Sequence, residues 1–240
     1  MRYETSYVIV AGIAWLRRSR VETQDGRVED TVWLVLFDGE RPVARRGVAG
    51  ESTIERGELD GISWDLSWTE LATSFETPNR LLRTVAPTHL VTTPALSISG
   101  RIGDRVLNAA PGHTARLWGK RHAQTWGWAH ASTADGMWAH LLSALAPPLP
   151  RVAQHATERG GPGFPIARSH VEPPRVRVGP YVVDAPVETF IGLRYLDTDG
   201  SDLWCYHSER GHLRGAGIDM PGAAMEIAVR APIAGWRVEA

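Results

Sequence analysis

The residues best suited to chemistry in this 240-residue chain lie in one short segment, Lys120–Ser132 (KRHAQTWGWAHAS). Read with a period of two, its odd positions are mostly small, and its even positions are His122, Gln124, Trp126, Trp128 and His130. Because alternate side chains of an extended strand point to opposite faces, the rings would share one face. An apolar surface with a few polar groups is typical of the wall of a ligand cavity. The segment therefore predicts a pocket for a flat or extended apolar molecule.

Imidazole and indole side chains on such a face would support acid–base chemistry. We expect His130 or His122 to transfer the proton, because the ordinary pKa of histidine lies close to neutrality. Trp126 and Trp128 would hold and shield the substrate, and indole faces stabilise developing positive charge. The plainer interpretation of each histidine is a polar rim residue or a hydrogen-bonded core residue.

Two further polar residues belong to the same hypothesis. Gln124 would orient a polar group or a water molecule, and His113 would add a weaker imidazole to the lining. On a straight strand His122 and His130 would be about 26 Å apart, and the chain contains no H-x-H motif. We therefore expect no metal site.

Composition limits the classes of partner. The net charge of −1 argues against a general nucleic-acid-binding protein, which needs a basic surface. The ten Trp residues would line a pocket or fill a loosely packed core. The single cysteine, Cys205, suits a reducing cytoplasm, and no apolar run is long enough for an integral membrane helix. Nucleotide and dinucleotide motifs are absent, so we expect no cofactor, and the oligomeric state stays open.

Strand patterns dominate the elements that would position these residues. Ile62–Trp68 alternates cleanly, so Trp64 and Trp68 share a face and are further candidates for the pocket lining. Apolar residues at helical spacing predict one short helix over 135–145, ended by Pro147-Pro148. The Pro- and Gly-rich stretch 147–180 predicts a connection between an N-terminal half, 1–146, and a C-terminal β half, 181–240.

The segment Pro111–Ala131 resembles the signature region of the lipocalin-like group that includes carotenoid 1,2-hydratase (hydroxyneurosporene synthase) and tocopherol cyclase. The resembling features are Trp118-Gly119, the Trp126-Gly127-Trp128 step and the polar His130 that follows it. The resemblance implies an all-β fold of two lipocalin-like antiparallel barrels or sandwiches with a hydrophobic pocket in or between them. It also implies hydration, cyclisation or related chemistry without a cofactor, and places Trp118 among the residues near the substrate.

These observations give two leading hypotheses of function. The first is a cofactor-independent enzyme that hydrates, cyclises or isomerises a hydrophobic small molecule such as a terpenoid or polyketide. The second is a non-catalytic carrier of an apolar metabolite, which needs the indoles but tolerates loss of the histidines. A structural module whose Trp residues all lie in the core is a third possibility.

Overall fold

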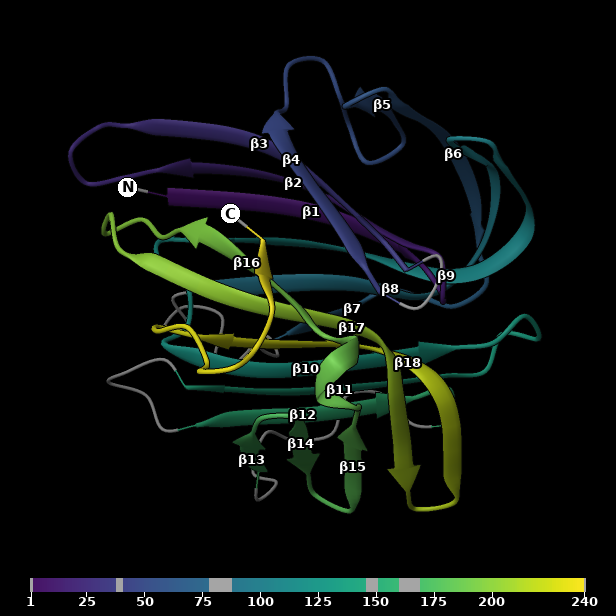
Figure 1. The fold of residues 1–240 in the computed structure, drawn as a ribbon. Coiled ribbons are helices and arrows are strands. Elements are labelled where there is room, and N and C mark those ends of the chain that lie inside the picture. Colours follow the sequence, from purple (N-terminus) through teal and green to yellow (C-terminus); the bar gives the residue numbers. More distant parts are fainter. Residues whose placement is uncertain (1, 38–40, 78–87, 146–150, 160–168, 240) are drawn as a thin grey trace.

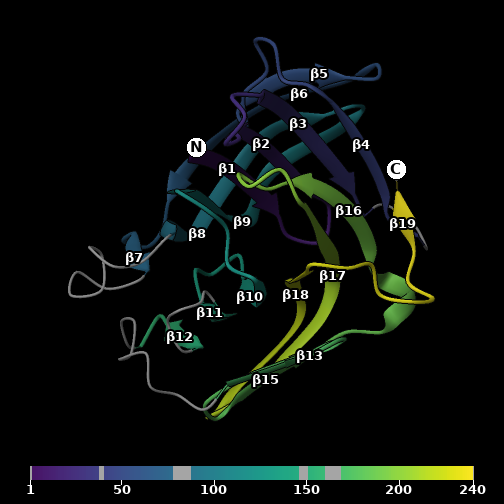
Figure 2. The same cartoon turned by 90° about the vertical axis from the view of Figure 1, so that its left-hand side faces the viewer.

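The structure of the protein is a computed structural model that describes residues 2–37, 41–77, 88–145, 151–159 and 169–239. Within these ranges the chain forms a nine-stranded sheet followed by a ten-stranded sheet, almost entirely antiparallel. Each sheet curls into a nearly closed barrel, and the two barrels stack against each other (Figures 1 and 2). The predicted all-β fold of two antiparallel barrels is confirmed.

The first sheet is built from residues 2–119. Its strands are β1 (Arg2–Val10), β2 (Ala14–Glu22), β3 (Val28–Leu36), β4 (Val43–Val48), β5 (Arg56–Leu59), β6 (Ile62–Glu70), β7 (Phe75–Thr77), β8 (Thr88–Ile102) and β9 (Arg105–Gly119). They run in the order β4-β3-β2-β1-β9-β8-β6-β5, and β7 pairs with β8.

The second sheet is built from residues 125–239. Its strands are β10 (Thr125–Ser132), β11 (Trp138–Leu145), β12 (Val152–Thr157), β13 (Ser169–Glu172), β14 (Arg175–Val178), β15 (Tyr181–Asp184), β16 (Ile191–Leu196), β17 (Asp202–Gly215), β18 (Ile218–Val229) and β19 (Val238–Glu239). The main order is β12-β11-β10-β18-β17-β15-β14-β13, and β16 pairs with both β17 and β19. A short 3-10 turn, η1 (Val187–Thr189), precedes β16.

Both sheets follow the same plan, in which the first strand pairs with the last long hairpin: β1 with β9, and β10 with β18. The first hairpins also turn alike. Thr23 and Thr133 each donate a side-chain hydrogen bond to the aspartate two residues on. Gly26 and Gly136 follow with φ of 82° and 85°, a backbone conformation that favours glycine. The second sheet therefore repeats the organisation of the first.

Buried apolar side chains form three large clusters. One contains only residues of the first sheet, among them Leu16 and Trp64, and another only residues of the second, among them Ala129 and Val176. The third lies between the sheets, and we call it the intersheet layer. Its buried apolar members are Tyr7, Ile9, Trp15, Trp33, Val35, Phe37, Ala44, Leu90, Ala115, Ala123, Trp126, Trp128, Ile191, Leu193, Tyr195, Leu203, Cys205, Ala224 and Ala228.

The helix predicted over 135–145 is wrong, because residues Trp138–Leu145 form strand β11. This strand is covered on both faces: Trp138 and Leu142 turn toward the first sheet's side, and Leu141 packs inside the second barrel. A strand buried on both sides carries a near-continuous apolar run, which can mimic helical spacing. The only helical element in the described ranges is η1, and no helix there is long and apolar enough to cross a bilayer.

The change from one sheet to the other lies at 120–124, upstream of the connection predicted over 147–180. The Pro- and Gly-rich stretch contributes strands of its own, β12, β13 and β14, where it is described. Strand β10, which falls in the predicted N-terminal half, pairs with β18 near the end of the chain, and β11 pairs with β10 and β12. The proline-rich composition predicted a boundary at 147–180, whereas the pairing of β10 with β18 puts the boundary between the two sheets before β10.

Candidate functional site

Strand β10 presents the predicted ring-bearing face. Trp126, Trp128 and His130 are all buried, and both indoles belong to the intersheet layer. On the opposite face Ala129 and Ala131 pack inside the second barrel. The predicted alternation of β10 is therefore confirmed, and its ring-bearing face looks onto the first sheet rather than into either barrel.

Neighbouring strands add polar side chains to this face, because residues that are paired across a sheet point the same way. In the second sheet Trp128 pairs with Glu226, which pairs in turn with His207, and His130 pairs with His140. In the first sheet Tyr7 pairs with Arg17, and Ile9 pairs with His113. The layer thus holds buried ionisable groups from both barrels among its aromatic rings.

Glu226 is the centre of the polar contacts at one end of the layer, where it is 7% exposed. Trp126 Nε1 donates to its Oε1 at 2.5 Å. Arg17 Nη1, from the opposite sheet, and His207 Nδ1 each lie 3.4 Å from its Oε2. Burial raises the pKa of Glu226, and the nearby Arg17 opposes that rise. The guanidinium of Arg17 also lies 4.1 Å from the ring centre of Tyr195. A buried ion pair therefore joins the two sheets.

Three histidines meet toward the other end of β10. The ring centres of His113 and His130 are 3.8 Å apart, and those of His130 and His140 are 5.7 Å apart. Burial lowers the pKa of all three, that of His130 to about 3. They are neutral imidazoles at pH 7.

The partners of His130 fix where the protons of this cluster sit. Its Nε2 is 2.7 Å from the carbonyl oxygen of Pro94, which only accepts, so Nε2 is the donor. Its Nδ1 then carries the lone pair, and His140 Nδ1 donates to it at 3.5 Å. Nε2 of His140 then carries a buried lone pair that has no partner among the described residues. A neutral imidazole in this state can accept a proton from a ligand.

Further buried polar atoms near the centre of the layer have no partner in the part of the chain that the structure describes. They are Trp15 Nε1, Arg17 Nε, Thr92 Oγ1, His113 Nε2 and Trp128 Nε1. The rings of Tyr7, Trp15 and Trp128 lie 5.6–5.8 Å from one another. Because buried polar groups in native proteins nearly always have partners, such a cluster indicates a place that receives polar atoms from outside the chain.

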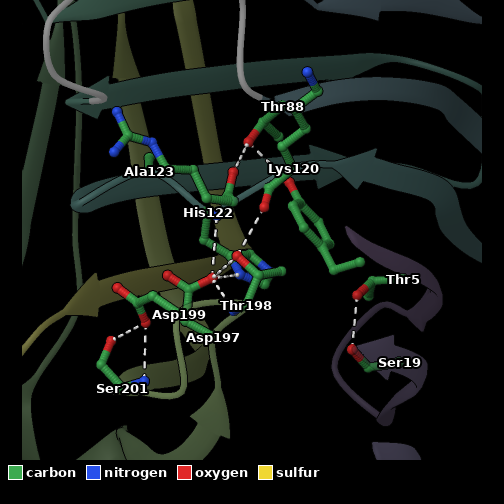
Figure 3. A network of polar contacts seen from close by, with 12 residues as sticks. Thr5, Ser19, Thr88, Lys120, His122, Ala123, Asp197, Thr198, Asp199 and Ser201 are labelled. Atoms are coloured by element: carbon green, nitrogen blue, oxygen red, sulfur yellow. Dashed lines mark hydrogen bonds and ion pairs between the residues drawn. The ribbon is translucent and has the colours of Figure 1, made fainter. Parts of the chain in front are cut away.

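His122 lies apart from the histidine cluster, in the connection between the sheets. Its ring stacks on Tyr3 with centroids 3.7 Å apart, and its Nδ1 is 2.8 Å from Asp197 Oδ1 (Figure 3). Arg230 Nη2 lies 2.7 Å from the other oxygen of Asp197. Burial lowers the pKa of His122, and the hydrogen bond with Asp197 opposes this. The hydrogen bond with Asp197 links the connection to the β16–β17 turn, and the ring of His122 lies 6.0 Å from that of Trp126 in the layer.

Four predicted lining residues lie elsewhere. Gln124 is exposed, because residues 121–124 are not a strand and the alternation begins only at Thr125. Trp64 and Trp68 pack in the core of the first barrel. Trp118 is partly exposed and lies on the face of β9 opposite to His113. These positions correct the expectation that they share one lining with Trp128.

Sequence reasoning missed Arg17, His140, His207 and Glu226. One signal was present: Glu226 is the single charge in the apolar strand AAMEIAV, flanked at alternate positions by Ala224 and Ala228. Arg17 and Glu226 are 209 residues apart, so their pairing depends on how the two sheets stack. Among the residues that the structure describes, no three or more His, Cys, Asp or Glu are placed to hold a metal ion.

Fold and site together define a two-barrel, lipocalin-like β protein with a polar aromatic layer between its barrels. No protein-family model matches the chain. It is 26% identical over 184 residues to two uncharacterized proteins of Mycobacterium tuberculosis, MT0513 of strain CDC 1551 and Rv0493c of strain H37Rv. The match covers 65% of this chain and 56% of each relative, so the chain spans little more than half their length.

A solved structure shares the whole fold. NE1406 from Nitrosomonas europaea, provisionally described as an ATTH, superposes with a TM-score of 0.55 over 96% of this chain and 92% of that chain. The two sequences are 13% identical, so this similarity concerns the fold alone. It agrees with the lipocalin-like two-barrel arrangement that the sequence resemblance implied.

Proposed function

We propose that the intersheet layer binds a hydrophobic small molecule and acts on it by acid–base chemistry without a cofactor. The observation that carries this proposal is the cluster of partnerless polar atoms among aromatic rings from both sheets. Apolar walls with a few polar groups are the usual composition of a small-molecule site.

Proton transfer in this proposal runs through the His130–His140 pair. His140 Nε2 accepts the proton, and His130 positions His140 by accepting its Nδ1–H and donating to the carbonyl of Pro94. Trp126 and Trp128 hold the substrate, and their indole faces shield developing positive charge. Isomerisation of a terpenoid- or polyketide-like molecule needs such a transfer, in which the proton that His140 accepts returns to another carbon of the substrate. Hydration and cyclisation need, in addition, a donor that protonates the substrate. His122 takes no direct part, since Asp197 and Tyr3 occupy its surroundings.

A carrier of an apolar metabolite is the second candidate. The environment of His130 favours this second function, because both of its ring nitrogens have hydrogen-bond partners inside the protein, as in a structural histidine. A carrier needs the rings of the layer and no proton acceptor. A cytoplasmic location is part of the same proposal, because the single buried thiol of Cys205 is compatible with a reducing compartment.

Binding is tested with an uncharged apolar fluorophore, N-phenyl-1-naphthylamine. We expect the parent protein to bind it and Trp128→Ala to bind it at least about tenfold more weakly, because a central ring is lost. Trp118→Ala, on the face of β9 opposite to His113 and the layer, is the matched control and should bind like the parent. Equal affinity of parent and Trp128→Ala would place the binding site elsewhere.

Catalysis is tested by incubating bound ligands in D₂O and measuring deuterium uptake by mass spectrometry. Exchange at allylic positions, or at positions next to a carbonyl, reports proton transfer without knowledge of the final product. We expect exchange with the parent, loss of exchange with His140→Gln, and retained binding in both. A parent protein that binds ligands but exchanges none of their protons is the carrier.

A further inference from the structure

Two indole N–H groups at the centre of the layer lack an acceptor within the described ranges, unlike other buried indoles of this protein. Elsewhere in the described core Trp33 donates to Thr31 Oγ1 at 3.1 Å, and Trp64 donates to the carbonyl oxygen of Thr53 at 3.0 Å. Trp126 likewise donates to Glu226. Trp15 and Trp128 are 2% and 4% exposed, yet neither Nε1 has a partner. A buried indole N–H normally finds an acceptor.

The two indole rings that carry these donors come from opposite sheets and lie next to each other. Trp15 is on β2 and Trp128 is on β10, and their ring centres are 5.6 Å apart. Nε of Arg17, which lies on β2 two residues after Trp15, is a third buried donor without an acceptor. The centre of the layer therefore holds buried donors from both barrels, and no acceptor among the described residues receives them.

The charges around these donors balance. The guanidinium of Arg17 is compensated by Glu226, 3.4 Å away. His113 and His207, whose rings lie 5.2 Å from Trp128 and 4.3 Å from Trp15, are neutral because burial lowers their pKa values. A carboxylate or phosphate in this region would be a buried anion without a free cation, which is costly. An uncharged oxygen needs only the donors that are present.

We propose that the ligand of the intersheet layer carries an uncharged oxygen acceptor, such as a carbonyl, which receives hydrogen bonds from the indole N–H groups of Trp15 and Trp128. Its apolar body packs on the rings of Tyr7 and Trp128. This inference rests on the proposed function and narrows its substrate class to oxygen-bearing apolar molecules. A pure hydrocarbon would leave the donors unpaired, and an anionic amphiphile would bring an uncompensated charge.

Three probes of matched shape test this inference by calorimetric titration: 2-acetylnaphthalene, 2-ethylnaphthalene and 2-naphthoate. We expect the ketone to bind at least about tenfold more tightly than the hydrocarbon and the anion, since a buried donor left unpaired on binding is penalised. Trp15→Phe and Trp128→Phe should each reduce that preference. Trp118→Phe, outside the layer, should keep it.

A second measurement does not depend on how well the variants pack. The carbonyl stretch of ¹³C-labelled 2-acetylnaphthalene bound to the parent protein should move to lower frequency than in hexane, as hydrogen bonding to the oxygen requires. Equal binding of ketone and hydrocarbon, tightest binding of 2-naphthoate, or an unshifted stretch overturns the inference and leaves the proposed function standing. Failure of all three probes to bind contradicts the proposed function itself.

Discussion

Arg17 and Glu226 form an ion pair whose side chains are 6% and 9% exposed, and each stabilises a charge that the other brings into the layer. Removing one partner of a buried pair leaves the other uncompensated, and this destabilises proteins by about 3–5 kcal/mol. We expect Arg17→Met to lower the free energy of unfolding by that amount in urea denaturation. The double variant Arg17→Met/Glu226→Leu should recover part of the loss, because neither charge is then left alone.

The exposed pair Arg56–Asp65 is the control for this prediction. Its side chains are 78% and 64% exposed, and solvent screens such pairs to about 0–1 kcal/mol. Arg56→Met should therefore change the free energy of unfolding by less than about 1 kcal/mol. If Arg17→Met lowered the free energy of unfolding as little as Arg56→Met, the buried pair would not be an important link between the sheets.

The imidazole of His130 makes the stability of the protein depend on pH. Burial lowers its pKa to about 3 in the folded chain, whereas the unfolded chain binds a proton below about pH 6.5. The unfolded state thus binds more protons between these values, so stability falls as the pH falls through that window. At pH 5 His130 alone should account for a loss of about 2 kcal/mol relative to pH 7.

Urea midpoints at pH 7 and pH 5 measure this effect in the parent and in His130→Asn. The variant should be less stable at pH 7, because the contact with Pro94 is lost, but its stability should change less between the two pH values. An identical pH dependence in both proteins would mean that His130 is protonated in the folded state at pH 5.

At the scale of elements, β10 needs a residue without a side chain at its third position, Gly127. A Cβ built on Gly127 would lie 2.4 Å from Val176 Cγ2 and 3.0 Å from Val171, on the face that looks into the second barrel. Both contacts are closer than packed atoms allow, so Gly127→Ala should lower stability by about 1–3 kcal/mol through overpacking. Thermal unfolding of Gly127→Ala, Val176→Ala and the double variant tests this. The double variant should be more stable than the sum of the two losses predicts, and strict additivity would contradict the contact.

Strand β10 was predictable from sequence and β11 was not, for a physical reason. The two faces of β10 differ, with rings on one side and Gly127, Ala129 and Ala131 on the other, so a period of two is visible. Both faces of β11 are buried by apolar residues, so no period of two distinguishes it from a helix. The same limit explains why Gln124 was wrongly predicted to line the ring-bearing face, because no local pattern shows that the strand begins only at Thr125.

The candidate site was predictable only in part. Local alternation placed Trp126, Trp128 and His130 on one face. Arg17 and Glu226 contribute as much to the layer, but they meet through the stacking of two sheets. A pattern along one strand carries no information on which face of another sheet will cover it.

At the scale of the whole molecule, the two barrels share a core rather than merely touching. Each barrel has an apolar cluster of its own, and the intersheet layer adds a third to which both contribute. The layer also contains the buried ion pair and the histidine cluster, so separating the barrels would expose charged groups together with the rings. The protein should therefore unfold as one cooperative unit, and circular dichroism and Trp fluorescence should report the same midpoint.

A fragment of residues 1–122 tests whether the first barrel is stable without the second sheet. It retains all nine described strands of the first sheet, but its face of the layer, including Tyr7, Trp15 and Trp33, would turn toward solvent. Burial of each such side chain contributes about 1.5–3 kcal/mol, so the loss summed over the aromatic and aliphatic members from the first sheet is comparable with the 5–15 kcal/mol by which domains are usually stable. We expect it to bind apolar dyes and to unfold without a sharp transition. Co-expression with residues 123–240 should restore the cooperative transition, because the second sheet again covers the rings. A fragment that is folded and monomeric alone would show instead that the first barrel does not depend on the layer.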